Sequence, residues 1–306
     1  MSETPQDTLV IPLKITRMPM LHAFTWLKNA ITLIKAQPLV MVLATTWIIF
    51  AEMLLTGILP GVGMVLFLLI APALAFGMAD VCQSIRLQDT TSPLSIFTPL
   101  FNPVRNRLLS LGLIYATLLF GLFLVSQTFI DQTALNESLK KMMALQDVNS
   151  IEAMRTQSKE ILAQLMQQKG LFLAFGMMIA GSLLIQTLLM YSPLFAVWQN
   201  MQAPQAVWLS IRTILINILP ISLTIMLIFG IFSALSLAVS ILTMHSPSLM
   251  MFLIMGLWML FNTVINAVTY TSYYDIIRSS LTQSVQGRID HLLEESSDKN
   301  DSSEHK

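Results

Sequence analysis

A single carboxylate stands inside a long apolar stretch and is the first residue that could do chemistry. Glu52 lies in the segment 39–59, about 12 Å along a helix axis from the end of that segment near Pro60. Placing an ionised side chain in a bilayer costs about 2.5–3.5 kcal/mol on insertion scales, so such residues are functional candidates. We expect Glu52 either to be protonated and serve a proton-coupled step, or to be wetted at the outer surface or hydrogen-bonded between helices.

A second group of polar side chains recurs at helical spacing in the last apolar segment, 249–274. Its members are Asn262, Thr263, Asn266, Thr269 and Tyr270. Such a stripe either joins helices, at about 0.6–2 kcal/mol per hydrogen bond, or lines a route for a solute. The candidate polar intramembrane site therefore comprises Glu52, Asn262, Asn266 and Tyr270. Transport is favoured if these groups meet in one hydrated cavity.

Signals for other chemistry are missing from the sequence. The four histidines are scattered, and no H-E-x-x-H, phosphate-loop or nucleophile-elbow motif occurs. The single cysteine, Cys82, excludes an intrachain disulfide, and a net charge of +0 gives nucleic acid no electrostatic footprint. We predict no catalytic, cofactor-binding or metal-binding residue, no nucleic-acid partner and no enzymatic activity. A membrane-embedded enzyme built from dispersed residues is a third alternative.

Long apolar helices must position these residues. The chain of 306 residues is 55% hydrophobic and 11% charged, against about 25% charged in soluble domains. A bilayer core of about 30 Å needs roughly 20 apolar residues as helix. Six segments are long enough: 39–59, 61–83, 108–130, 171–198, 218–244 and 249–274. Their continuous apolar runs exclude a β-barrel, so we predict an all-α polytopic membrane protein.

The basic residues predict the orientation. All 17 Lys and Arg fall outside the six segments, twelve of them on the side of both termini and five in residues 131–169. The positive-inside rule then places both termini in the cytoplasm of a bacterium, with the chain in the inner membrane. The 37 mixed residues before the first segment do not resemble a signal peptide.

Residues 21–37 predict an amphipathic helix lying in the membrane interface, with lysines toward the headgroups and Trp26 at the boundary. Pro38 disfavours helical geometry at the preceding residue and has no N–H, so the chain can turn there into the first span. Trp208 precedes Pro220 by twelve residues, as Trp26 precedes Pro38. We expect these four residues to form structural elbows.

A less regular third copy precedes the third span, where residues 96–104 share an apolar face. Spans two and four also share a motif, Ala71-Pro72-Ala73-Leu74 and Ser192-Pro193-Leu194-Phe195. Together the copies predict three repeats of amphipathic helix, span and return span, with interfacial helices before spans one, three and five.

The chain resembles an uncharacterised family of bacterial inner-membrane proteins found mostly in beta-proteobacteria. The resemblance is carried by AFTWLKNAITLIKAQPLVMVL, ILPGVGMVLFLLIAPALAFGMADVCQ, MYSPLFAVWQNMQAPQAVWLSIRTILINILPISL and TYTSYYDIIR. These runs cover most of residues 20–280. The resemblance implies a six-span inner-membrane fold and supplies neither catalytic residues nor a substrate.

The polar parts complete the predicted domain organisation. Residues 131–169 carry two apolar stripes at helical spacing, which predict a periplasmic helical hairpin. The stripes either pack on each other or dock a protein partner. We expect a cytoplasmic segment at 1–19, a six-span domain at 20–284 and a disordered tail at 285–306, which is too polar to fold.

The main functional hypothesis is a non-enzymatic organiser of the inner membrane or a partner-binding scaffold. Its partners would be the lipid bilayer and possible protein contacts at the hairpin. The alternative is a transporter or channel for a small or amphipathic solute, using Glu52 and the polar stripe of span six. Neither the solute nor the oligomeric state follows from the sequence.

Overall fold

The computed structural model describes residues 15–133, 136–137, 140 and 169–303. Within these ranges the elements are helical. Six helical segments are long and apolar enough to cross a membrane: Pro38–Ile58, Val62–Arg86, Arg105–Gln127, Gly170–Trp198, Ile218–Leu242 and Pro247–Ile277. They agree with the predicted spans to within three residues at each end. The prediction of an all-α, multi-pass membrane protein is therefore confirmed by length and composition.

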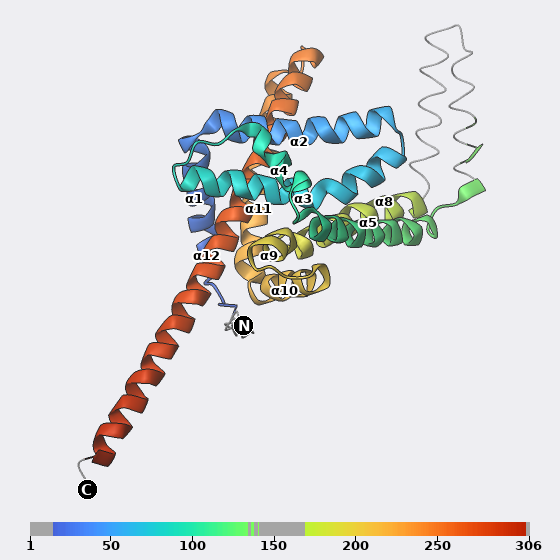
Figure 1. Ribbon diagram of the computed structural model, residues 1–306. Coiled ribbons are helices and arrows are strands. Elements are labelled where there is room, and N and C mark those ends of the chain that lie inside the picture. The colour runs from blue at the N-terminus through green and yellow to red at the C-terminus, as the bar shows by residue number, and fades with distance from the viewer. Residues whose placement is uncertain (1–14, 134–135, 138–139, 141–168, 304–306) are drawn as a thin grey trace.

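The long helices form a layer that a last helix crosses. The layer consists of α2 (Pro38–Ile58), α3 (Val62–Arg86), α5 (Arg105–Gln127) and α8 (Lys169–Leu189). Each packs against the next (Figure 1). The helix α11 (Ile218–Leu242) pairs with α12 (Pro247–Ser303), and α12 passes obliquely across the layer to contact α2, α3 and α1 (His22–Ala36) (Figure 1).

The buried core lies at one end of this arrangement. It forms where α1, the second half of α3 and residues 261–277 of α12 meet α9 (Ser192–Trp198). The opposite parts of the helices expose large apolar side chains, including Met226, Leu242, Met251 and Phe252. Acyl chains are as apolar as these side chains, so this surface suits a bilayer and would be costly in water.

Two glycines bring backbones into direct contact. A Cβ at Gly77 would overlap the backbone of Ile96, and a Cβ at Gly112 would overlap the backbone of Leu69. Because lipid gives little hydrophobic force between helices, close backbone approach at small residues is a main source of their packing energy. These contacts hold α3 against α5 and against the connection that follows α3.

The fourth apolar segment is two helices, whereas the sequence predicts one continuous span. It breaks at Met190 and Tyr191, since Pro193 has no N–H to bond the carbonyl of Leu189. That carbonyl instead accepts a hydrogen bond from Ser192 Oγ at 2.6 Å. The same proline motif does not break α3, which continues through Pro72.

The hydroxyl of Ser210 bonds two more backbone groups that this break leaves without helical partners. Ser210 lies on α10 (Ala203–Ile216), and its Oγ donates to the carbonyl of Leu188 at 2.7 Å. The same oxygen accepts from the N–H of Tyr191 at 3.2 Å. One buried side chain thus satisfies two backbone groups that a continuous helix would have paired internally.

The region before α5 is not the single amphipathic helix that residues 96–104 predict. It consists of a 3₁₀ turn, η1 (Pro93–Phe97), and a short helix, α4 (Thr98–Phe101). Ile96 is buried, whereas Phe101 is 80% exposed, so the two side chains do not share a face. Pro99 and Pro103 each remove a backbone donor, which prevents a longer helix.

Three predictions concern the polar segments of the chain. The proposed hairpin at 131–169 and residues 1–14 lie largely outside the described residues. The sequence predicts a disordered tail from residue 285, whereas the structure continues α12 as helix to Ser303. The division into domains stays a prediction.

The close contact at Gly112 predicts a loss of stability on a minimal substitution. Gly112→Ala should lower the free energy of unfolding in detergent by about 1–3 kcal/mol, because the added methyl group forces α5 away from Leu69. Cys82 is buried and is the only cysteine, so a thiol-reactive dye reports thermal unfolding. The control is Gly121→Ala on the same helix, where a Cβ meets no atom within 4 Å. Equal melting curves for the two variants would contradict the contact.

Candidate functional site

The predicted intramembrane site does not come together as one cluster. Glu52 lies on an exposed part of α2. The side-chain amides of Asn262 and Asn266 donate within their own helix, to Trp258 O at 2.8 Å and to Asn262 O at 3.0 Å. No hydrogen bond between Glu52 and either asparagine occurs in the described part of the chain. A common route past these three residues therefore stays a prediction.

The polar stripe of α12 contributes to helix packing instead. Thr263 Oγ1 donates to Thr45 Oγ1 of α2 at 3.1 Å, and both side chains are buried. This bond marks the crossing point of the two helices. Glu52 lies seven residues beyond Thr45, which is about 10 Å farther along α2. The arrangement favours the interpretation of the stripe as a link between helices.

Tyr270 belongs to an aromatic group near the middle of α12. Its side chain is 2% exposed, and its ring lies edge-on to Trp198 with a centroid distance of 6.1 Å. The guanidinium of Arg86 lies 3.4 Å from the ring centroid of Tyr274 and 5.9 Å from that of Tyr270. Cation–π contacts of this kind contribute about 0.5–2 kcal/mol. These contacts stabilise the packing of the end of α3 against α12.

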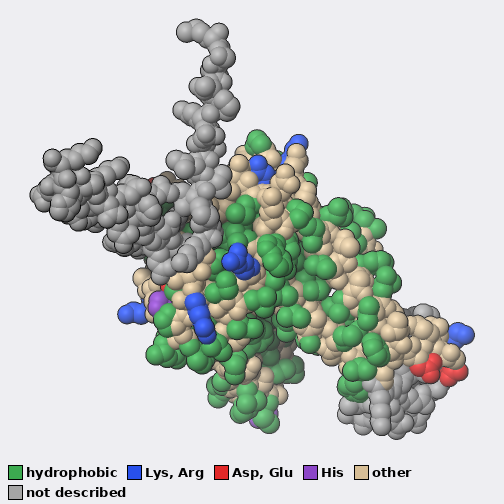
Figure 2. All heavy atoms as spheres, turned by 90° about the horizontal axis from the view of Figure 1, so that it is seen from below, with side chains coloured by type: hydrophobic (Ala, Val, Ile, Leu, Met, Phe, Trp, Pro, Cys, Tyr) green, Lys and Arg blue, Asp and Glu red, His purple; other side chains and the backbone are tan. Residues whose placement is uncertain are grey.

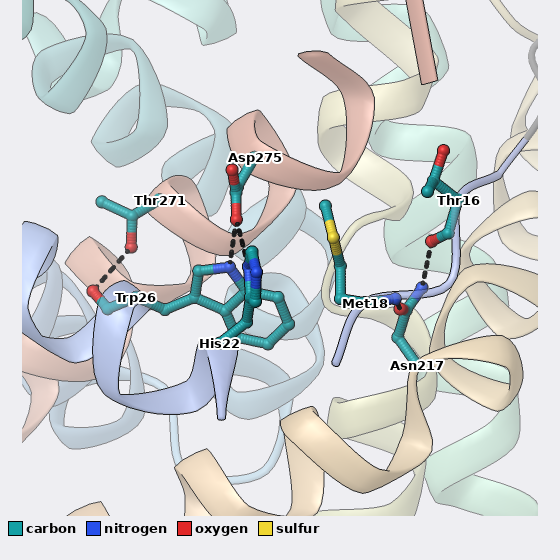
Figure 3. Close-up of polar contacts among 7 residues, drawn as sticks. All are labelled: Thr16, Met18, His22, Trp26, Asn217, Thr271 and Asp275. Atoms are coloured by element: carbon teal, nitrogen blue, oxygen red, sulfur yellow. Dashed lines mark hydrogen bonds and ion pairs between the residues drawn. The ribbon is translucent and has the colours of Figure 1, made fainter. Parts of the chain in front are cut away.

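A polar junction that the sequence analysis does not predict joins α1 to α12. The carboxylate oxygen Oδ2 of Asp275 accepts from Trp26 Nε1 at 2.9 Å, and His22 Nδ1 lies 3.1 Å from the same oxygen (Figure 3). On the other side of the indole, Thr271 Oγ1 donates to the backbone carbonyl of Trp26 at 3.2 Å. Two side chains of α1 thus converge on a carboxylate that lies about 250 residues later in the chain.

Asn217 forms a second junction with the N-terminal segment. Its Oδ1 accepts from the N–H of Met18 at 2.8 Å, and its Nδ2 donates to the carbonyls of Thr16 at 3.2 Å and Thr213 at 3.1 Å (Figure 3). The side chain is fully buried. The oxygen and the nitrogen of the amide are therefore both hydrogen-bonded. They join the segment before α1 to the bend between α10 and α11.

The chain bends near both predicted prolines. It turns at Gln37, directly before Pro38, which is the first residue of α2. It also turns at Asn217, and Pro220 follows in the first turn of α11, where a missing N–H costs nothing. Whether these bends join interfacial to spanning helices stays a prediction.

The two tryptophans of the paired motif lie in different surroundings. Trp26 is fully buried, whereas Trp208 is 67% exposed. The sequence predicts Trp26 at the membrane boundary, but its indole packs inside the protein and bonds Asp275. Long-range pairing with α12 decides its position, and periodicity within residues 21–37 carries no signal of that pairing.

The outer faces of α1 and α10 share one pattern, which we call the outward stripes. Each places an apolar, a basic and an apolar exposed residue at positions i, i+4 and i+7, on one helix face. The residues are Phe24, Lys28 and Ile31 on α1, and Trp208, Arg212 and Leu215 on α10. Figure 2 shows Lys and Arg side chains set among hydrophobic ones on the face seen from below.

The opposite faces of these two helices are docked on the protein. On α1 the buried residues are Ala23, Trp26, Ala30 and Leu33. On α10 they are Ala203, Ala206, Ser210, Thr213 and Ile214. The apolar side of α1 is therefore divided. Its central residues are buried in the core, whereas Phe24 and Ile31 at its edge are exposed.

Comparison of the chain with protein-family models, with curated proteins and with solved structures finds no match to any of them. The family resemblance therefore stays a prediction. In the described ranges, no three His, Cys, Asp or Glu side chains lie together as metal ligands would.

The junction at Asp275 predicts a large effect from removing one N–H. Trp26→Phe keeps an aromatic ring in the core but deletes the donor to the carboxylate, so unfolding should become easier by about 1.5–3 kcal/mol. Trp208→Phe is the matched control, because that ring is mostly exposed. The measurement is again the dye-reported melting temperature. A Trp26→Phe variant as stable as the control would show that the bond contributes nothing.

Proposed function

We propose that this chain is a non-enzymatic protein of the bacterial inner membrane that organises lipid, or holds a partner, at the cytoplasmic leaflet. In this proposal both termini are cytoplasmic, and α1 and α10 lie along the leaflet. The residues that act are then those that touch lipid, and no bond is made or broken.

The outward stripes are the observation that carries this proposal. A basic side chain between two apolar ones can bury its methylene stem and apolar neighbours while its charge reaches the phosphate level. Two helices with this pattern, docked by their inner faces on the spanning helices, form rigid interfacial contacts. The position of the basic side chains at the inner ends of α3 and α5 agrees with a cytoplasmic location for this side.

The described contacts give little support to the transport alternative. A proton-coupled route would need Glu52 to face other polar groups across a hydrated space. Glu52 instead lies outside the packed interior, and the asparagines of α12 bond their own helix.

The position of α1 and α10 can be tested by lipid quenching and by labelling. In proteoliposomes, a variant that keeps Trp208 as its sole tryptophan should be quenched by lipids brominated near the headgroup. The matched variant that keeps only Trp26 should be protected, since its indole is buried. In cells, cysteines replacing Lys28 and Arg212 in a Cys82→Ser background should react only with reagents that enter the cytoplasm. Periplasmic labelling at either site, or an unquenched Trp208, would refute the proposal.

Glu52→Gln separates the proposal from the transport alternative. The amide keeps the shape of the side chain, so folding and expression should be unchanged. Proton flux into proteoliposomes and growth across external pH should equal those of the wild type, because no route passes Glu52. A lost proton-dependent phenotype in a normally folded Glu52→Gln variant would instead favour transport.

A further inference from the structure

An open hollow of about 290 Å³ lies between the first turns of α5 and α10. Its lining residues are Asn106, Arg107, Ser110, Gln202, Ala203 and Pro204. One of these side chains is a cation, three are neutral and polar, and none is acidic. The residues of the predicted intramembrane site and the two polar junctions take no part in it. The composition suits a small anion with an apolar neighbour.

The cation of this hollow is held in place by neighbouring oxygens. The guanidinium of Arg107 donates to Asn200 Oδ1 and to the backbone carbonyl of Ala196, the latter at 3.4 Å. Asn200 adopts a φ of 54°, in the left-handed region, at the turn between α9 and α10. In the described ranges no carboxylate forms an ion pair with Arg107. A guanidinium has five N–H donors, so several remain for a ligand.

The amides of the α10 N-terminus are largely occupied, so the side chains must supply the remaining donors. Gln202 and Gln205 form a reciprocal capping box, in which the N–H of Gln202 donates to Gln205 Oε1 at 3.4 Å. Pro204 has no N–H. Because the capping box uses the oxygen of the Gln202 side chain, its NH₂ group remains free to donate.

We propose that this hollow binds the phosphate group of an anionic phospholipid in the cytoplasmic leaflet. The planar fork of Arg107 matches two phosphate oxygens, and the amides of Asn106 and Gln202 add neutral donors. The apolar surface of Ala203 and Pro204 suits the first carbons of the acyl chains. α5 turns apolar from Leu108 onward, so Arg107 lies where the span meets the phosphate level. The inference rests on the cytoplasmic orientation proposed above.

The test is binding of dioleoyl phosphatidylglycerol to the full-length protein in detergent, followed by native mass spectrometry. Arg107→Gln should weaken binding about tenfold, as expected for losing charge-assisted hydrogen bonds. Arg105→Gln is the control, because it removes the same charge from an exposed position in the first turn of α5, outside the hollow and outside the outward stripes. Asn200→Gly should also weaken binding, since it deletes the group that orients Arg107 while glycine tolerates the positive φ.

Inorganic phosphate distinguishes the two sources of the ligand. Retention of phosphatidylglycerol in millimolar phosphate assigns the site to lipid, whereas displacement that depends on Arg107 would show that free phosphate fills it and would overturn the lipid assignment. Equal effects of Arg107→Gln and Arg105→Gln, or no effect of either, would overturn the site altogether. If the cysteine labels still report a cytoplasmic location, only this inference fails; if they do not, the proposed function fails as well.

Discussion

The carboxylate of Asp275 holds the first described helix of the chain to the last. It accepts the indole N–H of Trp26 and lies within hydrogen-bond distance of His22, at the point where α1 crosses α12. Apolar contacts give little net attraction between helices in lipid. A charge-assisted hydrogen bond in a partly buried site therefore does much to determine which helices pack together. The docking of α1, and with it the direction of its outward stripe, depends on this junction.

Other irregular parts of the backbone follow the same rule. A break or bend inside a membrane protein exposes N–H and C=O groups that lipid cannot satisfy. Ser210 pairs the groups freed at the break before Pro193, and Asn217 pairs those of the N-terminal segment. These side chains contribute by completing the backbone. Pairing backbone groups therefore explains why Ser210 and Asn217 are polar although they are buried.

The sequence predicts the long helices well, because about 20 continuous apolar residues admit one structure in a bilayer. It does not predict local breaks, since Pro72 and Pro193 stand in similar motifs and only one interrupts its helix. At the break before Pro193, Ser210 on another helix bonds the freed backbone groups. The position of Trp26 likewise depends on Asp275, about 250 residues away. Contacts over such separations leave no periodic signal, so the sequence predicts the intramembrane site from residue types alone and not from the contacts that position them.

The separation between Trp26 and Asp275 also constrains how the protein is made. At about 5–20 residues per second, translation places roughly 12–50 s between the two residues. During that interval the newly made α1 lacks its carboxylate partner, and for most of it the segment before α1 also lacks Asn217. If α1 lies on the leaflet as proposed, its exposed Lys28 and Lys35 can hold it at the headgroups until the last two spans are made. Affinity for the lipid surface would then serve the biogenesis of the protein as well as its finished form.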